Sequence, residues 1–320
     1  MIKFSDVSKQ YADGTEALTS LDLQIEDGEF FVLIGPSGCG KTTTLKMMNR
    51  LIDPSSGVIS MDEKEIASYD IHELRWDIGY VLQQIALFPH MTIEENIAIV
   101  PELKKWDKKK VQTRVDELLE MVGLDPLVYK NRKPDELSGG QQQRVGVARA
   151  LAADPQVILM DEPFSALDPI SREKLQDDVV ELQQRIKKTI VFVTHDMQEA
   201  LKIGDRICIM KEGRVVQVGT PHDILHNPVN EFVKEFVGIN TLPTDEVNLE
   251  QLMDHTLEQK VDKSLSIIST PSSLKKVLAA LAQEDELSVE KDGEIIGILS
   301  RQKIVQYMAD NMQERGENHE

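Results

Sequence analysis

The chain of 320 residues has 41% apolar and 28% charged side chains, an ordinary composition for a globular protein that buries a sizeable core in two domains. Its formal net charge of −19 argues against a nucleic-acid-binding surface, because such surfaces need clustered lysine and arginine to displace counterions. We expect no membrane-spanning helix, secretory leader or disulfide framework, since no apolar run approaches ~20 residues, the first residues lack a leader pattern, and the chain holds two cysteines, Cys39 and Cys208.

The strand pattern predicts both antiparallel and parallel pairing. Apolar and polar residues alternate over 2–7 and 21–25, which indicates half-buried antiparallel strands. Three continuously apolar segments, 30–34, 157–160 and 190–193, are typical of buried parallel strands. Each ends just before residues suited to phosphate chemistry. Because ligands bind outside the carboxyl ends of parallel strands, we expect the three ends to converge on one site.

Between residues 85 and 155 the pattern becomes helical. The apolar residues of 111–122 follow a period of 3.6, and Gly123 is expected to end that helix. This insertion should form a separate helical lobe. After His195, the run ICIMKEGRVVQVG predicts two short strands around a turn, and a helix is expected near 228–237.

A glycine-rich loop, GPSGCGKTT, follows the strand 30–34 and precedes a helix. Its glycines permit a tight turn in which successive N–H groups point at phosphate oxygens, aided by the positive end of the helix. Lys41 supplies a positive charge, Thr42 a hydroxyl ligand for Mg²⁺, and Thr43 a donor to a phosphate oxygen. The candidate nucleotide contacts are Gly35, Pro36, Ser37, Gly38, Cys39, Gly40, Lys41, Thr42 and Thr43.

An Asp-Glu pair follows the strand 157–160. Asp161 is positioned to hold Mg²⁺ through water, and Glu162 to polarise an attacking water as a general base. The alternative is an acidic surface turn without chemistry. Four apolar residues directly before the pair place the two carboxylates at a strand end.

The run LSGGQQQR at 137–144 opens a further helix. Ser138 is well suited to cap it, and capping alone would be a sufficient role for a serine. It does not account for Gly139 and Gly140, since each glycine costs ~1 kcal/mol at a helix start unless the backbone must approach something closely.

With LSGGQ at this distance before the Asp-Glu pair, residues 1 to about 240 resemble the ATP-binding subunit of an ABC transporter. The resemblance implies a P-loop α/β fold with a mixed sheet core, an antiparallel β subdomain and a helical lobe. It implies an ATPase that uses ATP and Mg²⁺ and acts as a homodimer. In that family the run Ser138, Gly139, Gly140 and Gln141 faces the γ-phosphate bound by the other subunit.

The same resemblance implies further site residues. Gln83 matches a glutamine that contacts Mg²⁺ or the attacking water and links the site to the transmembrane partner, although Gln84 is adjacent. His195 matches a histidine that contacts the γ-phosphate. Asp168 lies in a loop that crosses the dimer interface. Tyr11 stands where an aromatic ring stacks on adenine, while an isolated tyrosine near a strand end is also commonly a packing residue.

The stretches LIGPSGCGKTTTLKMMNRLI and GYVLQQIALFPHMTIEENIAIVPELKKW are similar to importers of quaternary ammonium osmoprotectants such as glycine betaine, carnitine or choline. This implies transmembrane permease subunits, a solute-binding protein or domain, no nucleic-acid partner, and a location on the cytoplasmic face of the membrane. An importer ATPase for another solute, such as an amino acid, remains an alternative. A soluble ABC ATPase acting on DNA or ribosomes is a further one.

Beyond a predicted linker at 241–260, residues 261–312 have the order strand, helix, strand, strand, helix. With GILSRQK, this resembles a single degenerate CBS motif. Lys303 stands where the family pattern has an aspartate for a ribose, which disfavours nucleotide binding and leaves packing or dimerisation as an alternative. We expect the tail 313–320 to be disordered.

Overall fold

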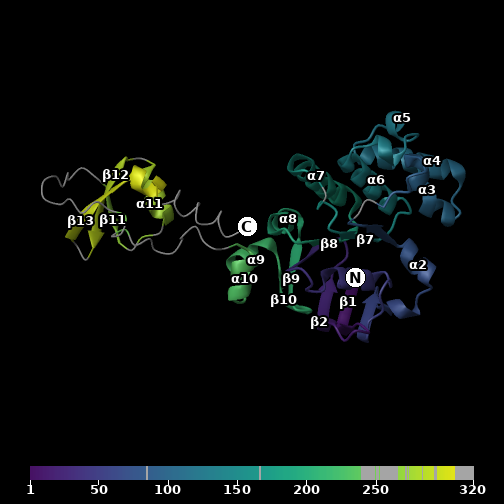
Figure 1. The fold of residues 1–320 in the computed structure, drawn as a ribbon, viewed down its shortest axis with the longest axis horizontal. Coiled ribbons are helices and arrows are strands. Elements are labelled where there is room, and N and C mark those ends of the chain that lie inside the picture. The colour runs from purple at the N-terminus through teal and green to yellow at the C-terminus, as the bar shows by residue number, and fades with distance from the viewer. Residues whose placement is uncertain are drawn as a thin grey trace. The chain divides into compact units, whose positions relative to one another are not determined.

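The computed structural model of the chain describes residues 1–83, 86–165, 167–238, 249, 252, 266–270, 272, 274–282, 284–291 and 294–306 (Figure 1). They belong to two compact units, Met1–Val237 and Gly238–Glu320. Gln84, most of the predicted linker and the predicted tail lie outside the described residues.

The first unit contains an antiparallel sheet with the strand order β2-β1-β4-β5. The alternation at the start of the chain correctly predicts antiparallel pairing of β1 with β2, for example Phe4 opposite Leu23. β4 and β5 had no expectation from the sequence. The strands are β1 (Ile2–Gln10), β2 (Glu16–Ile25), β4 (Ser56–Met61) and β5 (Lys64–Glu65).

A second, six-stranded sheet has the order β10-β9-β3-β8-β7-β6. The three buried strands expected from the sequence, β3, β7 and β8, are parallel neighbours at its centre. Their carboxyl ends therefore lie along one edge, as predicted. The strands are β3 (Phe30–Ile34), β6 (Ile78–Val81), β7 (Val157–Asp161), β8 (Thr189–Thr194), β9 (Arg206–Lys211) and β10 (Arg214–Gly219).

Both faces of the central sheet are covered, so β3 is buried along its whole length. Phe30, Val32 and Ile34 face a core shared with the helices, while Phe31 and Leu33 face a core shared with the antiparallel sheet. Successive side chains of a strand point to opposite faces, so one apolar run serves two cores. This explains why the segment reads as continuous rather than alternating.

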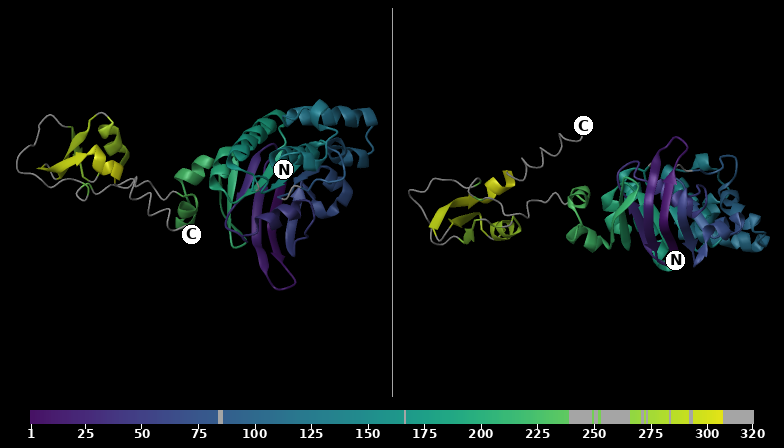
Figure 2. Two further views of the ribbon diagram at one scale, coloured as in Figure 1. Left: turned by 45° about the horizontal axis from the view of Figure 1, so that its top comes forward. Right: turned by 90° about the horizontal axis from the view of Figure 1, so that it is seen from below.

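The helical lobe expected between residues 85 and 155 is present, and its helices lie apart from the purple strands β1 and β2 in the views of Figure 2. Val111, Val115 and Leu118 form the buried stripe of α4. That helix ends before Gly123, which has a left-handed φ of 73°. The helices are α3 (Ile93–Leu103), α4 (Lys108–Met121), α5 (Pro126–Tyr129) and α6 (Gly139–Leu151).

The remaining helices surround the central sheet. The helix expected near 228–237 is α10, which is shorter because it begins at its cap Asn230. Within the part of the chain that the structure describes, no helix is long and apolar enough to span a membrane. The helices are α1 (Lys41–Met48), α2 (Ile71–Trp76), α7 (Pro169–Ile186), α8 (Met197–Ile203), α9 (Pro221–His226) and α10 (Glu231–Phe236).

The second unit has a three-stranded sheet of order β11-β12-β13 and the element order expected from the sequence. β11 pairs with β12 in parallel, and β12 pairs with β13 antiparallel. Residues 301–306 continue as a helix. A small separate core includes Val277, Leu287 and Ile304. The elements are β11 (Ile267–Ser269), α11 (Leu274–Leu281), β12 (Glu286–Lys291) and β13 (Glu294–Ser300).

Candidate functional site

The glycine-rich loop lies tightly against neighbouring backbone. A Cβ atom at Gly35 would come within 2.1 Å of the carbonyl oxygen of Met210, at the end of β9. A Cβ at Gly40, where φ is 103°, would lie 2.6 Å from the carbonyl oxygen of Ala17. The loop therefore needs glycine for space at both positions, and for conformation at Gly40.

Lys41 folds back into this loop from the first residue of α1. Its Nζ donates to the carbonyl oxygens of Gly35 at 2.7 Å and Pro36 at 3.0 Å. The side chain is only 6% exposed. A buried ammonium surrounded by neutral carbonyls is well placed to receive an anionic phosphate.

Thr42 and Asp161 meet although they are 119 residues apart, with Thr42 Oγ1 donating to Asp161 Oδ1 at 2.9 Å. Burial raises the pKa of the Asp161 carboxyl, and the hydrogen bond from Thr42 opposes that shift. Burial, and then the charge of Asp161, raises the pKa of the Tyr80 phenol on β6. The site thus offers two hard oxygen ligands in a partly desolvated setting.

Glu162 accepts hydrogen bonds from two other elements. Gln83 Nε2 lies 3.3 Å from Glu162 Oε2, and His195 Nδ1 lies 3.2 Å from the same oxygen. The backbone N–H of Glu162 donates to the carbonyl of Val193 at 3.0 Å. The ends of β6, β7 and β8 therefore bring three predicted catalytic side chains together, as the parallel sheet requires.

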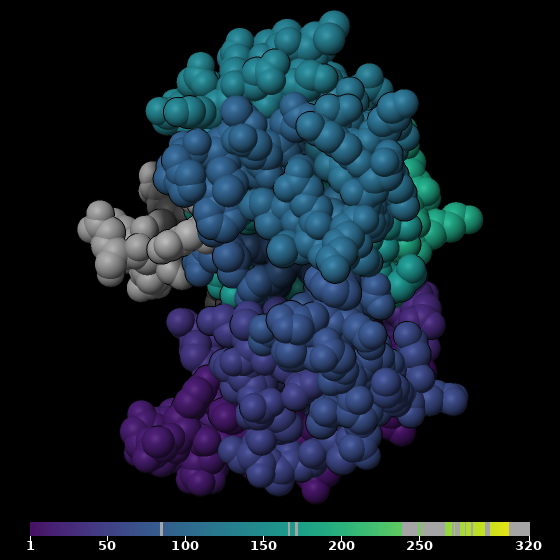
Figure 3. Space-filling view, turned by 90° about the vertical axis from the view of Figure 1, so that its right-hand side faces the viewer, coloured from purple at the N-terminus to yellow at the C-terminus, as the bar shows by residue number. Residues whose placement is uncertain are grey.

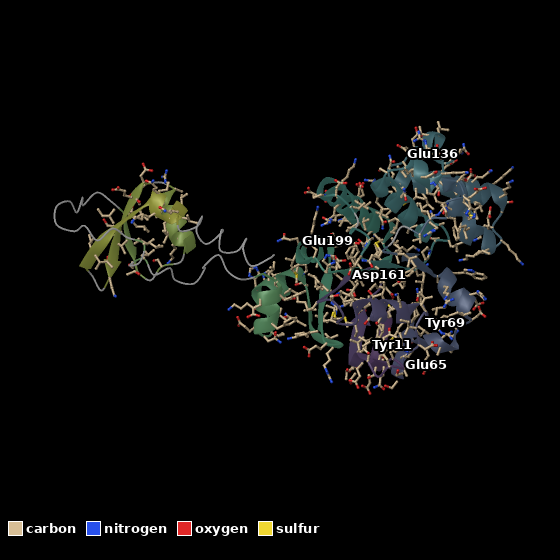
Figure 4. All side chains as sticks on the ribbon, in the orientation of Figure 1. Tyr11, Glu65, Tyr69, Glu136, Asp161 and Glu199 are labelled. Atoms are coloured by element: carbon tan, nitrogen blue, oxygen red, sulfur yellow. The ribbon has the colours of Figure 1, made fainter. Side chains whose placement is uncertain are left out.

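A cleft of about 540 Å³ runs over the glycine-rich loop. Tyr11 stands at its rim, 39% exposed, with its hydroxyl 3.4 Å from Thr43 Oγ1. Figure 4 shows Tyr11 at the antiparallel sheet and Asp161 nearer the helical lobe. The cleft contains Tyr11 and Glu162, the residue after Asp161, so it joins residues from the ends of strands of both sheets. Its lining residues are Tyr11, Thr15, Glu16, Ala17, Ser37, Gly38, Cys39, Gly40, Lys41, Thr42, Thr43, Glu162 and His195.

The LSGGQ run lies elsewhere, at the start of α6 in the helical lobe. Ser138 caps this helix, and its hydroxyl and the Gln141 side chain bond reciprocally to each other's backbone N–H. None of the four residues Ser138 to Gln141 lines the cleft. A Cβ at Gly139 would meet nothing within 4 Å in the described chain. The expected close approach at this glycine is therefore not made within the described part of the subunit.

The ABC transporter family profile matches residues 18–165. The chain is 57% identical to the glycine betaine/carnitine/choline transport ATP-binding protein OpuCA of Bacillus subtilis, over 83% of this chain and 71% of that protein. The chain belongs to the ABC transporter ATP-binding family. This ABC subunit is also 52% identical to the choline transport ATP-binding protein OpuBA of the same organism, over 89% of this chain and 76% of that one. It is 45% identical to the osmoprotectant import ATP-binding protein OsmV of Salmonella typhimurium, over 95% of this chain and 80% of that protein.

Solved structures agree with this membership. A dimeric ATP-binding cassette in a post-hydrolysis state with ADP and Pi bound matches with a TM-score of 0.62 and 37% identity, over 69% of this chain and 99% of that one. The cbiO1 subunit from Clostridium perfringens is part of the ABC transporter complex cbiONQ. It matches with a TM-score of 0.66 and 31% identity, over 76% of this chain and 95% of that chain. The ABC subunit is therefore an ATPase that binds ATP.

The Thr42–Asp161 pair fits the divalent ion that accompanies ATP. Mg²⁺ is commonly held by one or two carboxylates together with phosphate oxygens and water. Among the described residues, no group of three or more His, Cys, Asp and Glu side chains could hold a metal alone. An ion at Asp161 and Thr42 thus depends on the nucleotide for its remaining ligands.

Two residues that contribute to this site carried no signal in the sequence. Tyr80 lies within the sequence GYV of the short strand β6, and this run is too brief to be distinguished from a loop by its pattern. Glu199, on α8, is buried among polar partners. No motif of fixed spacing points to Tyr80 or Glu199, because their contacts with Asp161 and with Arg172 join segments that are distant in sequence.

Proposed function

We propose that this chain is the ATP-hydrolysing subunit that powers import of a quaternary ammonium compound, of the glycine betaine, carnitine or choline type, through a membrane ABC transporter. The observation that carries the proposal is the cleft lined by Lys41, Thr42 and Glu162, in which Thr42 is hydrogen-bonded to Asp161. The names of the relatives at 45–57% identity supply the class of solute.

In the proposed mechanism, the loop 35–43 holds the β- and γ-phosphates through its N–H groups, Lys41 and the N-terminus of α1. Tyr11 covers the adenine from the rim of the cleft. Thr42 and Asp161 would hold Mg²⁺, which would supply positive charge to offset the charge that develops on the phosphates. The remaining nucleotide contacts of the loop are Gly35, Pro36, Ser37, Gly38, Cys39, Gly40 and Thr43.

Glu162 acts as the general base that orients and deprotonates the attacking water. Its Oε2 is held by Gln83 at 3.3 Å and by His195 at 3.2 Å, so the carboxylate is directed by groups from two other strand ends. His195 is 65% exposed at its side chain and can reach the γ-phosphate from the cleft.

The working unit is a homodimer with composite sites. Ser138, Gly139, Gly140 and Gln141 of one copy contact the γ-phosphate held by the other, and Asp168 lies in the loop between the copies. The free space at Gly139 supports this arrangement, because a glycine with room for a side chain within its own subunit is available for an approach from outside it. The dimeric relative with ADP and Pi supplies the precedent.

Permease subunits dock beside the Gln83 loop. A groove of about 190 Å³ is lined by residues of α2, β6, α3 and α6, among them Trp76 and Val100. Figure 3 shows a face of the molecule on which indigo residues lie below the blue and teal lobe. Arg149 Nη1 donates to the carbonyl of Ala86 at 2.6 Å and so ties α6 to the loop. Phe88, two residues after Ala86, has a side chain that is 45% exposed. A permease helix in this groove would contact Arg149, which is bonded to the segment that follows Gln83.

This arrangement implies a peripheral protein on the cytoplasmic face of the membrane, with a solute-binding protein or domain delivering the solute to the permease. No residue of the proposed ATP site contacts the solute, so selectivity belongs to those partners. The net charge of −19 disfavours nucleic-acid partners.

The test is uptake of labelled glycine betaine, choline and carnitine by cells that carry wild-type protein or Glu162→Gln, at low and high osmolarity. Loss of uptake of at least one solute in the variant is the expected result. Glu65→Gln, an exposed site on β5, is the matched control and should transport normally. Unchanged uptake of all three solutes, with the variant present and inert as an ATPase, would remove the solute assignment.

A further inference from the structure

Glu199 is a charged side chain of α8 that does not line the ATP cleft. It is 6% exposed, and burial raises the pKa of its carboxyl. A buried carboxylate is unfavourable unless hydrogen bonds or a positive partner offset the loss of water. The polar contacts of Glu199 offset this cost.

The first contact reaches the strand end that carries His195. Glu199 Oε2 accepts a hydrogen bond from Thr194 Oγ1 at 2.6 Å, and Thr194 directly precedes His195. Thr194 Oγ1 in turn accepts the backbone N–H of Asp196 at 3.0 Å. The Glu199 carboxylate thus holds the Thr194 hydroxyl. That hydroxyl belongs to the residue before His195 and bonds to the backbone of the residue after it.

The second set of contacts reaches the segment that follows Glu162. Glu199 Oε1 accepts from Gln176 Nε2 at 3.3 Å and lies 3.9 Å from Arg172 Nε, both on α7. Arg172 Nη2 donates to the carbonyl of Leu167 at 3.2 Å, and its backbone N–H donates to the carbonyl of Asp168 at 2.9 Å. One carboxylate therefore connects the histidine to the loop proposed to cross the dimer.

A small cavity of about 40 Å³ lies among these groups, and its lining includes Glu162, His195 and Glu199. A cavity needs ~10–15 Å³ of such volume to hold a water molecule, so this one has room for at least one. Side chains do not fill the space behind the Glu162–His195 pair. Close packing therefore does not fix the His195 ring on this side, whereas the Thr194 hydroxyl holds the backbone next to it.

We propose that Glu199 is a positioning residue for ATP hydrolysis: through Thr194 it sets His195 against Glu162, and through Arg172 it links that setting to the loop at Leu167 and Asp168. The inference rests on the roles proposed above for Glu162 and His195. Its consequence is that removing the carboxylate slows the chemical step without weakening ATP binding, because no cleft-lining side chain is altered.

The experiment measures kcat and KM for ATP with the purified full chain. Glu199→Gln keeps the side-chain shape but loses the charge that faces Arg172. Thr194→Val keeps the volume and loses the hydroxyl. Both variants should lower kcat about 10-fold or more, with KM within about twofold of wild type. Thr194→Ser restores the hydroxyl and should recover most of the rate.

Because Glu199 acts through Thr194, the double variant Glu199→Gln/Thr194→Val should be no slower than the slower single variant. Glu65→Gln is the matched control and should leave both constants unchanged. Full additivity in the double variant, a raised KM with normal kcat, or Thr194→Ser as slow as Thr194→Val would overturn the inference. If Glu199→Gln does not fold, the kcat and KM of Thr194→Val and Thr194→Ser still test the inference.

Two further variants separate this inference from the proposed function. Glu162→Gln and His195→Ala are assayed in the same series. If both retain wild-type kcat, the roles proposed for the site are wrong, and the inference fails with them. If both lose activity while Glu199→Gln and Thr194→Val keep it, the positioning role alone is wrong.

Discussion

Glu162 adopts a left-handed backbone conformation with φ of 45°, which is uncommon for a residue with a side chain. The conformation occurs where β7 ends, and the backbone N–H of Glu162 bonds to Val193 of the neighbouring strand. Gln83 and His195 then bond to its carboxylate. The unusual φ therefore coincides with the residue that the site geometry favours as the base.

Replacing this carboxylate should separate binding from hydrolysis. Glu162→Gln keeps the shape and removes the base, so kcat should fall by about 10² to 10⁴, the usual range for a general base. ATP affinity should stay near that of wild type, because the phosphate loop is unchanged. Single-turnover hydrolysis and equilibrium binding of ATP measure the two quantities. Hydrolysis at the wild-type rate would contradict the assignment.

His195→Ala should also slow hydrolysis, since the imidazole lies 3.2 Å from Glu162 and reaches the cleft. We expect kcat to fall at least about 10-fold, less than the ~10²- to 10⁴-fold that a general acid or base itself contributes. His222→Ala, an exposed histidine on α9, is the matched control. A similar rate loss in both variants would point to a general effect of histidine removal rather than to the site.

The raised pKa of Asp161 gives a stability prediction. Its folded-state value lies above the ordinary 3.8, so the native protein holds this proton to higher pH than the unfolded chain does. The contribution of Asp161 to the free energy of unfolding therefore falls as the pH rises through that window. Without nucleotide, Asp161→Asn should melt higher than wild type at neutral pH.

The melting difference should shrink as the pH is lowered toward 3.8, where the carboxyl is protonated in both states. Thermal melts of both proteins across a pH series measure it. Asp135→Asn, at an exposed position, serves as the control. Addition of Mg²⁺ and ATP should stabilise wild type more than the variant, and an equal gain in both would contradict a metal role for Asp161.

At the scale of elements, the parallel order of β3, β8 and β7 is what assembles the site. Each strand was recognisable as an apolar run, and each is followed by its functional residues. Their neighbour relations follow from the sheet, which places residues such as Thr42 and Asp161 within 2.9 Å across 119 positions. The sequence predicts that the three strand ends converge at one edge of the sheet. Which residues touch one another is known only from the order of the strands in the structure.

Helix α6 allows a test of the composite site. Gly139 and Gly146 both belong to this helix, and a Cβ at either would meet nothing within 4 Å in the described chain. Each change to alanine should therefore stabilise the subunit by about 0.5 to 1 kcal/mol. Only Gly139→Ala should reduce ATPase activity, because only that position is proposed to face the partner's phosphate.

Denaturant unfolding and steady-state ATPase assays above the concentration at which the protein dimerises would measure both effects. The Gly146→Ala protein supplies the reference for a stabilised helix without an altered site. If Gly139→Ala hydrolysed ATP as fast as Gly146→Ala, the first residues of α6 would not need glycine for the partner nucleotide.

At the scale of the whole molecule, the chain divides into units of residues 1–237 and 238–320. Every residue of the candidate ATP site belongs to the first unit, which also contains both of its cores. The second unit has its own core, formed by residues between 249 and 304. The two units therefore have separate hydrophobic cores.

A chain ending at Val237 should fold and hydrolyse ATP with kcat and KM within about twofold of the full chain, because the described site and its supports are all retained. Thermal melting and steady-state ATPase assays of the two proteins would measure this. A large loss of hydrolysis in a folded truncated protein would assign part of the catalytic apparatus to residues 238–320.

The second unit is proposed to be a single CBS-like motif with weak or absent adenine-nucleotide binding. Ser300 ends β13, and its Oγ accepts the backbone N–H of Lys303 at 3.4 Å. Lys303 occupies the place of the ribose-binding aspartate in the family pattern. Calorimetry of the 245–320 fragment with AMP and with a cyclic dinucleotide should detect no micromolar binding, and such binding would contradict the proposal.

The sequence by itself determined the family, the strand-end residues, the helical lobe and the element order of the second unit, because each rests on local patterning or on motifs of fixed spacing. It did not indicate β4, β5 or β6, which are short or lack a clear alternation. Nor did it indicate Tyr80 or the contacts of Glu199 with Thr194 and Arg172. Only the tertiary structure decided these, because sheet order and helix packing bring together groups whose separation along the chain carries no signal.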